Sequence, residues 1–123
     1  MKRIFFILAA MALTIGLFTG CEKKHNEADA IIGHSYKCTA GDEWELFYFS
    51  SSGTSQLVSH TNGTTSTFNN FFYVIDGCNV EVHYDYSSYW KAEVKGQLLA
   101  AFTYYPDSDC LLSSFGDLFL RVN

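Results

Sequence analysis

The sequence has little positive charge, one proline and no long apolar helix. Lys and Arg number 8 in 123 residues against 13 Asp and Glu, so the formal net charge is −5. Because phosphate contacts need clustered Lys and Arg, this composition argues against a nucleic-acid partner. The longest apolar run covers residues 4–18. It is shorter than the about 20 residues of a membrane-spanning helix.

Motifs of catalysis are also missing from the sequence. There is no Gly-x-Ser-x-Gly turn, no Cys-x-x-Cys pair and no glycine-rich phosphate loop. We therefore expect no catalytic residues, no cofactor and no enzymatic activity. Glu81, His83 and Asp85 alternate along one strand face and could bind a metal. A solvated face with ion-pair partners is the simpler interpretation, so no metal site is predicted, and His34 and His60 are isolated in the sequence.

The first 21 residues have the pattern of an export signal. Lys2 and Arg3 precede the apolar run, and small residues follow it, as in secretory signals. A short membrane helix that stays attached is the alternative. Residues 17–21, Leu-Phe-Thr-Gly-Cys, resemble the lipobox of bacterial lipoproteins, although Phe18 stands where Leu is usual. The resemblance implies cleavage before Cys21 and lipidation of its thiol, which would attach the protein to a membrane.

The predicted domain organisation follows from this cleavage. Residues 1–20 form the signal peptide, 21–30 a polar tether and 31–123 one domain. The 103 residues after cleavage contain 18 aromatic residues, a composition that favours β-strands. Residues 22–24 do not resemble the acidic surface-export signals of Bacteroidota. The expected location is therefore the cell envelope, on the periplasmic leaflet of the outer membrane.

Alternating apolar and polar residues predict an all-β domain. Turn residues separate eight expected strands, at residues 35–39, 44–49, 54–60, 67–75, 78–86, 90–95, 98–105 and 117–122. Eight short antiparallel strands indicate an up-and-down barrel, since closure removes exposed edges. Asp76-Gly77 is a strong hairpin signal.

One hairpin register can be predicted from charge. A turn at residues 87–89 pairs Tyr86 with Trp90 on an apolar face. On the polar face this register sets three complementary pairs, Glu81 with Lys95, His83 with Glu93, and Asp85 with Lys91. Each such pair stabilises a sheet by about 0.2–1 kcal/mol. The register therefore gives every charged group a partner.

Several segments resemble the small lipocalin-like lipoproteins of Bacteroidota. They are residues 32–36, 47–54, 72–80 and 119–122, and their order spans nearly the whole domain. Tyr36 stands where a Trp is common in that family. The resemblance implies an up-and-down barrel and suggests binding of an apolar ligand.

The cysteines other than Cys21 allow one disulfide. If strand directions alternate through eight strands, Cys38 and Cys110 come to the same end of the barrel, with Cys78 at the other. A disulfide needs Cα atoms within about 7 Å, so Cys38–Cys110 is the predicted bridge. The alternative is that all three remain reduced.

The expected functional site is the loop-rich end of the barrel, where the aromatic residues Trp44, Tyr84, Tyr86, Trp90 and Tyr104 could line a ligand pocket. A core filled by these rings is equally compatible with the sequence. The acidic rim (Asp42, Glu43, Asp107 and Asp109) would favour cationic ligands. The leading hypothesis is a non-catalytic binding module for a small apolar or amphipathic ligand. The alternative is a protein-interaction module, such as an envelope enzyme inhibitor or accessory subunit. Tyr36, Cys38, Gly41 and Cys110 resemble elements of the small lipoprotein inhibitors of lysozyme.

Overall fold

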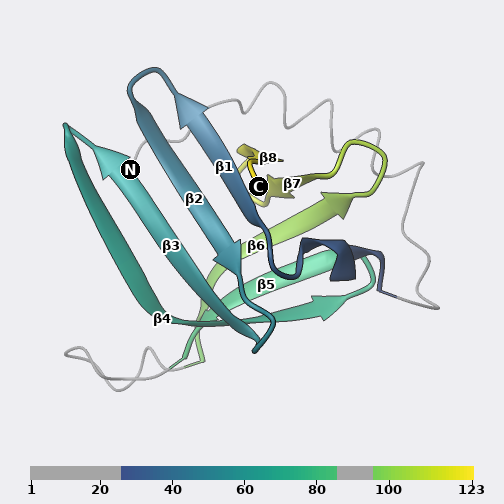
Figure 1. Ribbon diagram of the computed structural model, residues 1–123. Coiled ribbons are helices and arrows are strands. Elements are labelled where there is room, and N and C mark those ends of the chain that lie inside the picture. Colours follow the sequence, from purple (N-terminus) through teal and green to yellow (C-terminus); the bar gives the residue numbers. More distant parts are fainter. Residues whose placement is uncertain (1–25, 86–95) are drawn as a thin grey trace.

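The protein folds into a closed antiparallel β-barrel. The computed structural model describes residues 26–85 and 96–123 (Figure 1). The order along the chain is η1 (Glu27–Ile31), β1 (Ser35–Ala40), β2 (Glu43–Phe49), β3 (Thr54–Thr61), β4 (Thr64–Asp76), β5 (Asn79–Tyr84), β6 (Leu98–Tyr105), β7 (Cys110–Ser113) and β8 (Leu118–Arg121). Each strand pairs with the next, and β8 returns to β1. The predicted all-β, eight-stranded up-and-down barrel is confirmed.

Short turns with left-handed backbone set the hairpins. Between β3 and β4, Asn62 and Gly63 have φ of 54° and 77°, as a two-residue Asn-Gly hairpin turn requires. This turn lets β4 begin at Thr64, three residues before the predicted start at 67. The Asp76-Gly77 signal also marks a hairpin, since Asp76 pairs with Asn79 across it.

The predicted pairing of β5 with residues 90–95 is wrong. Strand β5 lies between β4 and β6, and Glu81 faces Val74 on one side and Ala101 on the other. His83 is opposite Leu98 on β6. Both edges of this strand are therefore occupied, which leaves no place for Lys95 opposite Glu81 or Glu93 opposite His83. Residues 86–95 themselves lie outside the described residues.

The strand that the sequence did not reveal is β7. Its four residues, Cys-Leu-Leu-Ser, are all buried, so they show no alternation of apolar and polar positions. The barrel still has eight strands, because β7 takes the place in the count that residues 90–95 were expected to fill. One consequence is that β6 runs in the opposite direction to the predicted one.

The two ends of the barrel follow from this strand order. The end that we call the mouth carries the β1–β2, β3–β4, β5–β6 and β7–β8 connections. The end that we call the base carries the other three connections and the chain entry at η1 (Figure 1). Asp42 and Glu43 lie at the mouth, whereas Asp107 and Asp109 lie at the base. The predicted acidic rim is therefore split between opposite ends.

Aromatic rings fill the interior of the barrel. Phe47, Phe102 and Phe119 contact one another edge to face, with ring centroids 5.1–5.6 Å apart. Aromatic pairs of this kind add about 0.5–1.5 kcal/mol each beyond the burial of their area. Tyr36 and Phe49 extend the cluster toward the base and are fully buried. The interior is thus a packed core over much of its length.

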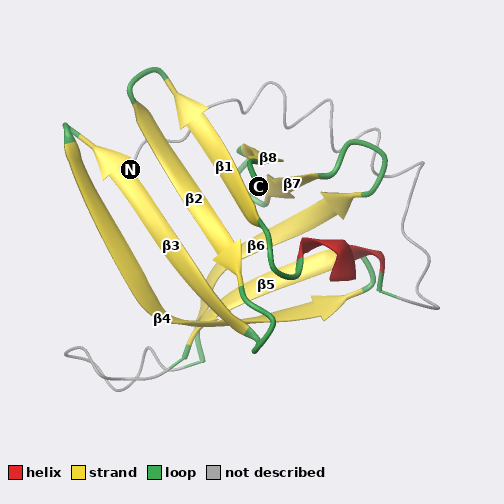
Figure 2. Ribbon diagram, in the orientation of Figure 1, coloured by secondary structure: helices red, strands yellow, loops and turns green. Residues whose placement is uncertain are grey.

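Helix η1 closes the base (Figure 2). Its Ala28 and Ile31 are fully buried. The backbone N–H of Ala28 donates to the carbonyl of Gly77 at 3.0 Å, and the N–H of Gly77 donates to Asn26 Oδ1 at 2.7 Å. Residues 26–31 therefore pack against the barrel, because these contacts join this segment to the β4–β5 turn.

Candidate functional site

A small apolar pocket lies inside the barrel on the mouth side of the core. Its volume is about 70 Å³. The lining side chains come from five strands and the β7–β8 turn: Glu45, Phe47, Leu57, Leu99, Ala100, Phe102, Ser113, Phe115 and Phe119. Seven of these nine are apolar. The pocket is therefore an apolar enclosure with two polar side chains, the carboxylate of Glu45 and the hydroxyl of Ser113.

The strand register explains how this lining is built. Residues paired across neighbouring strands share a face of the sheet, so each cross-strand row contributes one layer to the interior. One row joins Phe47, Leu57 and Phe68, and the next row toward the mouth joins Glu45, Ser59 and Ser66. The wall thus changes from aromatic to hydroxyl and carboxylate between two successive layers.

Large apolar side chains are exposed around the mouth. Phe115 in the β7–β8 turn is 59% exposed, and Leu98 at the start of β6 is 52% exposed on the outer face. Phe115 also lines the pocket. Phe68 on β4 is 40% exposed but lies deeper, in the row of Leu57.

Of the five residues predicted for the pocket, the three that the structure describes do not come together. Trp44 lies on the outer face of β2, where it stacks on His60 at 5.6 Å with Lys37 Nζ 4.5 Å from its ring centroid. Tyr84 faces inward at the mouth end of β5 and contacts Phe71. Tyr104 faces inward at the base end of β6. Tyr86 and Trp90 lie outside the described residues.

Trp44 points outward because alternation along β2 is fixed by the core. Phe47 and Phe49 are buried, so the even-numbered residue Trp44 takes the opposite face. The residue that sequence reasoning missed is Glu45, the next residue in the chain. The alternation of Glu43, Glu45, Phe47 and Phe49 was the available signal for it.

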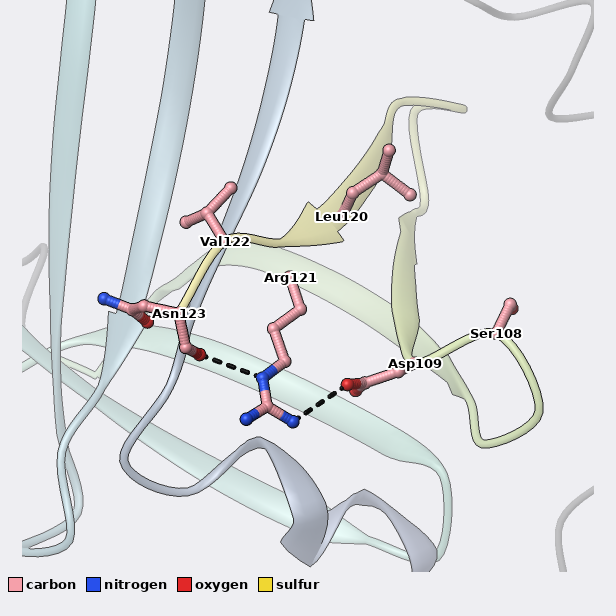
Figure 3. A pocket seen from close by; sticks show the side chains of 6 residues that line it. All are labelled: Ser108, Asp109, Leu120, Arg121, Val122 and Asn123. Atoms are coloured by element: carbon pink, nitrogen blue, oxygen red, sulfur yellow. Dashed lines mark hydrogen bonds and ion pairs between the residues drawn. The ribbon is translucent and has the colours of Figure 1, made fainter.

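Asp109 holds together a second cluster of polar side chains, at the base. Its Oδ1 accepts hydrogen bonds from the hydroxyls of Tyr36 at 2.6 Å and Tyr104 at 3.0 Å. Its Oδ2 is 3.1 Å from Arg121 Nη1 (Figure 3). Arg121 and Asp109 line an open depression of about 480 Å³ with Ser108, Leu120, Val122 and Asn123.

The titration properties of this cluster fit a structural role. Burial alone raises the pKa of the Asp109 carboxyl, but the hydrogen bonds from Tyr36, Arg121 and Tyr104 outweigh it and hold the pKa below its usual value. Burial, followed by the bond to Asp109, raises the pKa of Tyr36 and takes that of Tyr104 to about 12. At neutral pH the cluster therefore contains one carboxylate, one guanidinium and two neutral phenols, none of them poised to transfer a proton.

The predicted Cys38–Cys110 disulfide is absent, and both residues carry thiols. Lys37 pairs with Leu120, and Leu120 pairs with Cys110, so β8 separates the two cysteine-bearing strands. Two strand spacings amount to about 9.5 Å, beyond the reach of a disulfide. Cys38 also shares the inner face with Tyr36, whereas Cys110 shares the outer face with Leu120. Cys78 is the disulfide-bonded cysteine.

The structure also places Glu81, His83 and Asp85, the residues that were considered as metal ligands. His83 bonds Glu81 Oε1 through Nε2 at 2.9 Å and the carbonyl of Gly96 through Nδ1 at 2.9 Å. The N–H of Asp85 donates to the carbonyl of Asn70. Within residues 26–85 and 96–123, no three His, Cys, Asp or Glu side chains gather as metal ligands do. In the same segments, no helix has the length and apolar character needed to cross a bilayer.

Comparison with known proteins gives no match among family models, curated proteins or solved structures. The resemblance to lipocalin-like lipoproteins therefore stays a prediction.

Proposed function

We propose that this chain is an exported, lipid-anchored barrel that binds the apolar end of a small amphipathic ligand at its mouth and catalyses no reaction. The pocket among Leu57, Leu99, Phe102 and Phe119 is the observation that carries this proposal. The base is closed by η1 and by the Asp109 cluster, so a ligand would enter from the mouth.

The size of the pocket limits what it encloses. Sites that surround a whole drug-sized ligand have volumes of roughly 300–1,000 Å³, and an apolar cavity of about 150 Å³ holds benzene. A pocket of about 70 Å³ is therefore suited to the end of a short chain. The rest of the ligand would lie in the mouth, near the exposed ring of Phe115.

A substitution that fills the pocket tests this proposal. Ala100 lines the pocket, and Ala101 beside it is on the outer face opposite Glu81. We expect Ala100→Leu to weaken binding of 1-butanol at least about tenfold, because the new side chain takes the space of the ligand. Ala101→Leu is the matched control and should bind like the natural protein.

The measurement is ligand-detected NMR on the mature chain in phosphatidylcholine nanodiscs, with empty nanodiscs as the blank. Equal binding by the Ala100→Leu and Ala101→Leu variants would exclude the pocket as the site. Native mass spectrometry of the purified protein adds an independent result, since a co-purifying small molecule would identify a ligand directly.

The membrane part of the proposal depends on Cys21, which lies outside the described residues. We infer a diacylglyceryl thioether on this residue and a position at the periplasmic leaflet of the outer membrane. The mass of the N-terminal peptide after purification from membranes tests this inference. A lipid-free peptide that is released only by reductant would overturn the anchor.

A protein partner is the second candidate function. The exposed Phe115 and Leu98 at the mouth favour it, since exposed apolar and aromatic residues often anchor interfaces. An envelope enzyme inhibited or assisted by this barrel would lose affinity with Leu98→Ser, which changes a residue outside the pocket lining, and keep it with Ala100→Leu. A small ligand confined to the pocket would give the opposite order.

A further inference from the structure

The small pocket on the mouth side of the core has a chemically asymmetric wall. Glu45 brings a carboxylate to the pocket from β2, while Leu99, Phe102 and Phe115 form apolar parts of the lining on the β6 to β8 side. The row that joins Glu45 to Ser59 and Ser66 places two hydroxyls on the same inner wall. A molecule bound in the pocket would meet the carboxylate of Glu45 on one side and hydrocarbon on the other, with the hydroxyls of Ser59 and Ser66 in the same row beside the pocket.

We propose that the ligand is a primary ammonium compound with a short apolar chain, whose charged end lies against Glu45. This inference rests on the proposed function, because it assigns a ligand class to the same pocket. Glu45 also takes part in a further interaction in the structure. The two oxygens of its carboxylate accept about four hydrogen bonds between them, so they have the capacity to accept from an ammonium group as well.

The distribution of charge supports a cation over an anion. Asp42 and Glu43 add two carboxylates at the mouth, in and beside the β1–β2 turn. In the described part of the chain the basic side chains are Lys37 and Arg121. Lys37 lies over the Trp44 ring on the outer face, and Arg121 is paired with Asp109 at the base. Among the described residues, the charged side chains of the β1–β2 turn and of the inner wall at the mouth are therefore carboxylates, which attract cations.

The size of the pocket and the position of Glu45 define the probes. Butylammonium, 1-butanol and butyrate have the same apolar chain and differ in the charge of one end. We expect butylammonium to bind the mature chain in phosphatidylcholine nanodiscs about five- to tenfold more tightly than 1-butanol, with butyrate weakest. The advantage of the amine should shrink as NaCl is raised to 0.5 M, since salt screens partly exposed charges.

Glu45→Gln removes the charge and keeps the shape of the side chain. We expect this variant to bind butylammonium no better than 1-butanol, while its affinity for 1-butanol stays within about twofold. Glu81→Gln makes the same change in net charge on the outer face, where Glu81 is half-exposed and bonded to His83. The Glu81→Gln variant should bind all three probes with affinities within about twofold of those of the natural protein.

The outcomes separate the inference from the proposed function. If 1-butanol binds the natural protein as tightly as butylammonium, the ammonium assignment is overturned and the apolar pocket stands. If none of the three probes binds above the nanodisc blank, both are overturned. If Glu45→Gln fails to fold, the comparison of the three probes on the natural protein, at low and high salt, still gives the answer.

Discussion

The Asp109 cluster makes the stability of the barrel depend on one carboxylate. Asp109 stands in the turn between β6 and β7 with φ of 51°, a left-handed conformation that Asn tolerates nearly as well as Asp. Asp109→Asn therefore removes the charge without straining the backbone. Asp107→Asn is the matched control, because it changes an exposed carboxylate in the same turn.

The magnitude can be worked out from the three contacts of Asp109. Hydrogen bonds to a charged group contribute about 1.5–3 kcal/mol, against about 1 kcal/mol for neutral ones, and Tyr36 donates at 2.6 Å from a fully buried position. The Arg121 pair is 41% and 34% exposed on its two sides, so it adds less than about 1 kcal/mol. We expect Asp109→Asn to lower the free energy of unfolding by about 2 kcal/mol.

The same carboxylate sets a pH dependence. The pKa of Asp109 is lowered in the folded protein, so its contribution is present above the unfolded value near 4. That contribution is lost as the pH falls through the folded pKa, when the folded state must take up the proton. The stability difference between the natural protein and Asp109→Asn should therefore shrink below about pH 4, and stay constant between pH 5 and pH 7.

Urea unfolding followed by far-ultraviolet circular dichroism measures both effects. With a slope of about 1–2 kcal/mol per molar urea for a domain of this size, the midpoint of Asp109→Asn at pH 7 should fall by about 1–2 M. Asp107→Asn should shift it by less than about 0.3 M. Equal midpoints for the two variants, or a stability gap that widens as the pH falls, would refute the role assigned to Asp109.

Two further expectations concern the core and the cysteines. Phe119→Ala should lower the free energy of unfolding by about 3–5 kcal/mol, because Phe119 is 1% exposed among aromatic rings, whereas Phe115→Ala at the rim should change it by less than about 0.5 kcal/mol. A chemical melt of the two variants compares them directly, and similar losses would contradict the assigned packing. Peptide mapping without reductant should find no Cys38–Cys110 bridge, and Cys110 should alkylate slowly in the native protein because burial raises the pKa of its thiol. Recovery of the bridged peptide would contradict the position of β8 between these strands.

Local signals in the sequence were sufficient for most of the strands. Alternation located seven of the eight to within a few residues, since one face of each packs on the core and the other faces outward. Turn chemistry located the β4–β5 hairpin, and the Asn62-Gly63 pair would have located the preceding β3–β4 hairpin equally well. The count of eight was correct although one of its members was not.

The pairing of β5 shows where local reasoning fails. Three complementary charge pairs would contribute at most about 1 kcal/mol each. The observed pairing instead places Val80 opposite Phe102 and Val82 opposite Ala100, with both valines fully buried. Complete burial of such a side chain contributes about 1.5–3 kcal/mol. Barrel closure also satisfies every strand edge, a gain that no single hairpin register reveals.

One misplaced strand was enough to misplace the site. Because directions alternate around an up-and-down barrel, replacing residues 90–95 by β7 reverses β6 and moves the Asp107 and Asp109 turn from the mouth to the base. The same reversal separates Tyr104 from the mouth and Cys110 from Cys38. Such an error leaves the predicted fold class correct, whereas it makes the prediction of a site built from residues on several strands wrong.

A lipid anchor on Cys21 would lie on the side of the base, opposite the mouth. The described chain enters beside Gly77 at the base, where Asn26 bonds its backbone. Residues 21–25 span at most about 18 Å when extended, so a lipid on Cys21 would hold the base within about 20 Å of the membrane. The mouth, with Glu45 and Phe115, then opens away from that surface. An amphipathic ligand would have to reach it through the aqueous phase, which suits a short-chain ammonium compound with appreciable solubility better than a lipid confined to the bilayer.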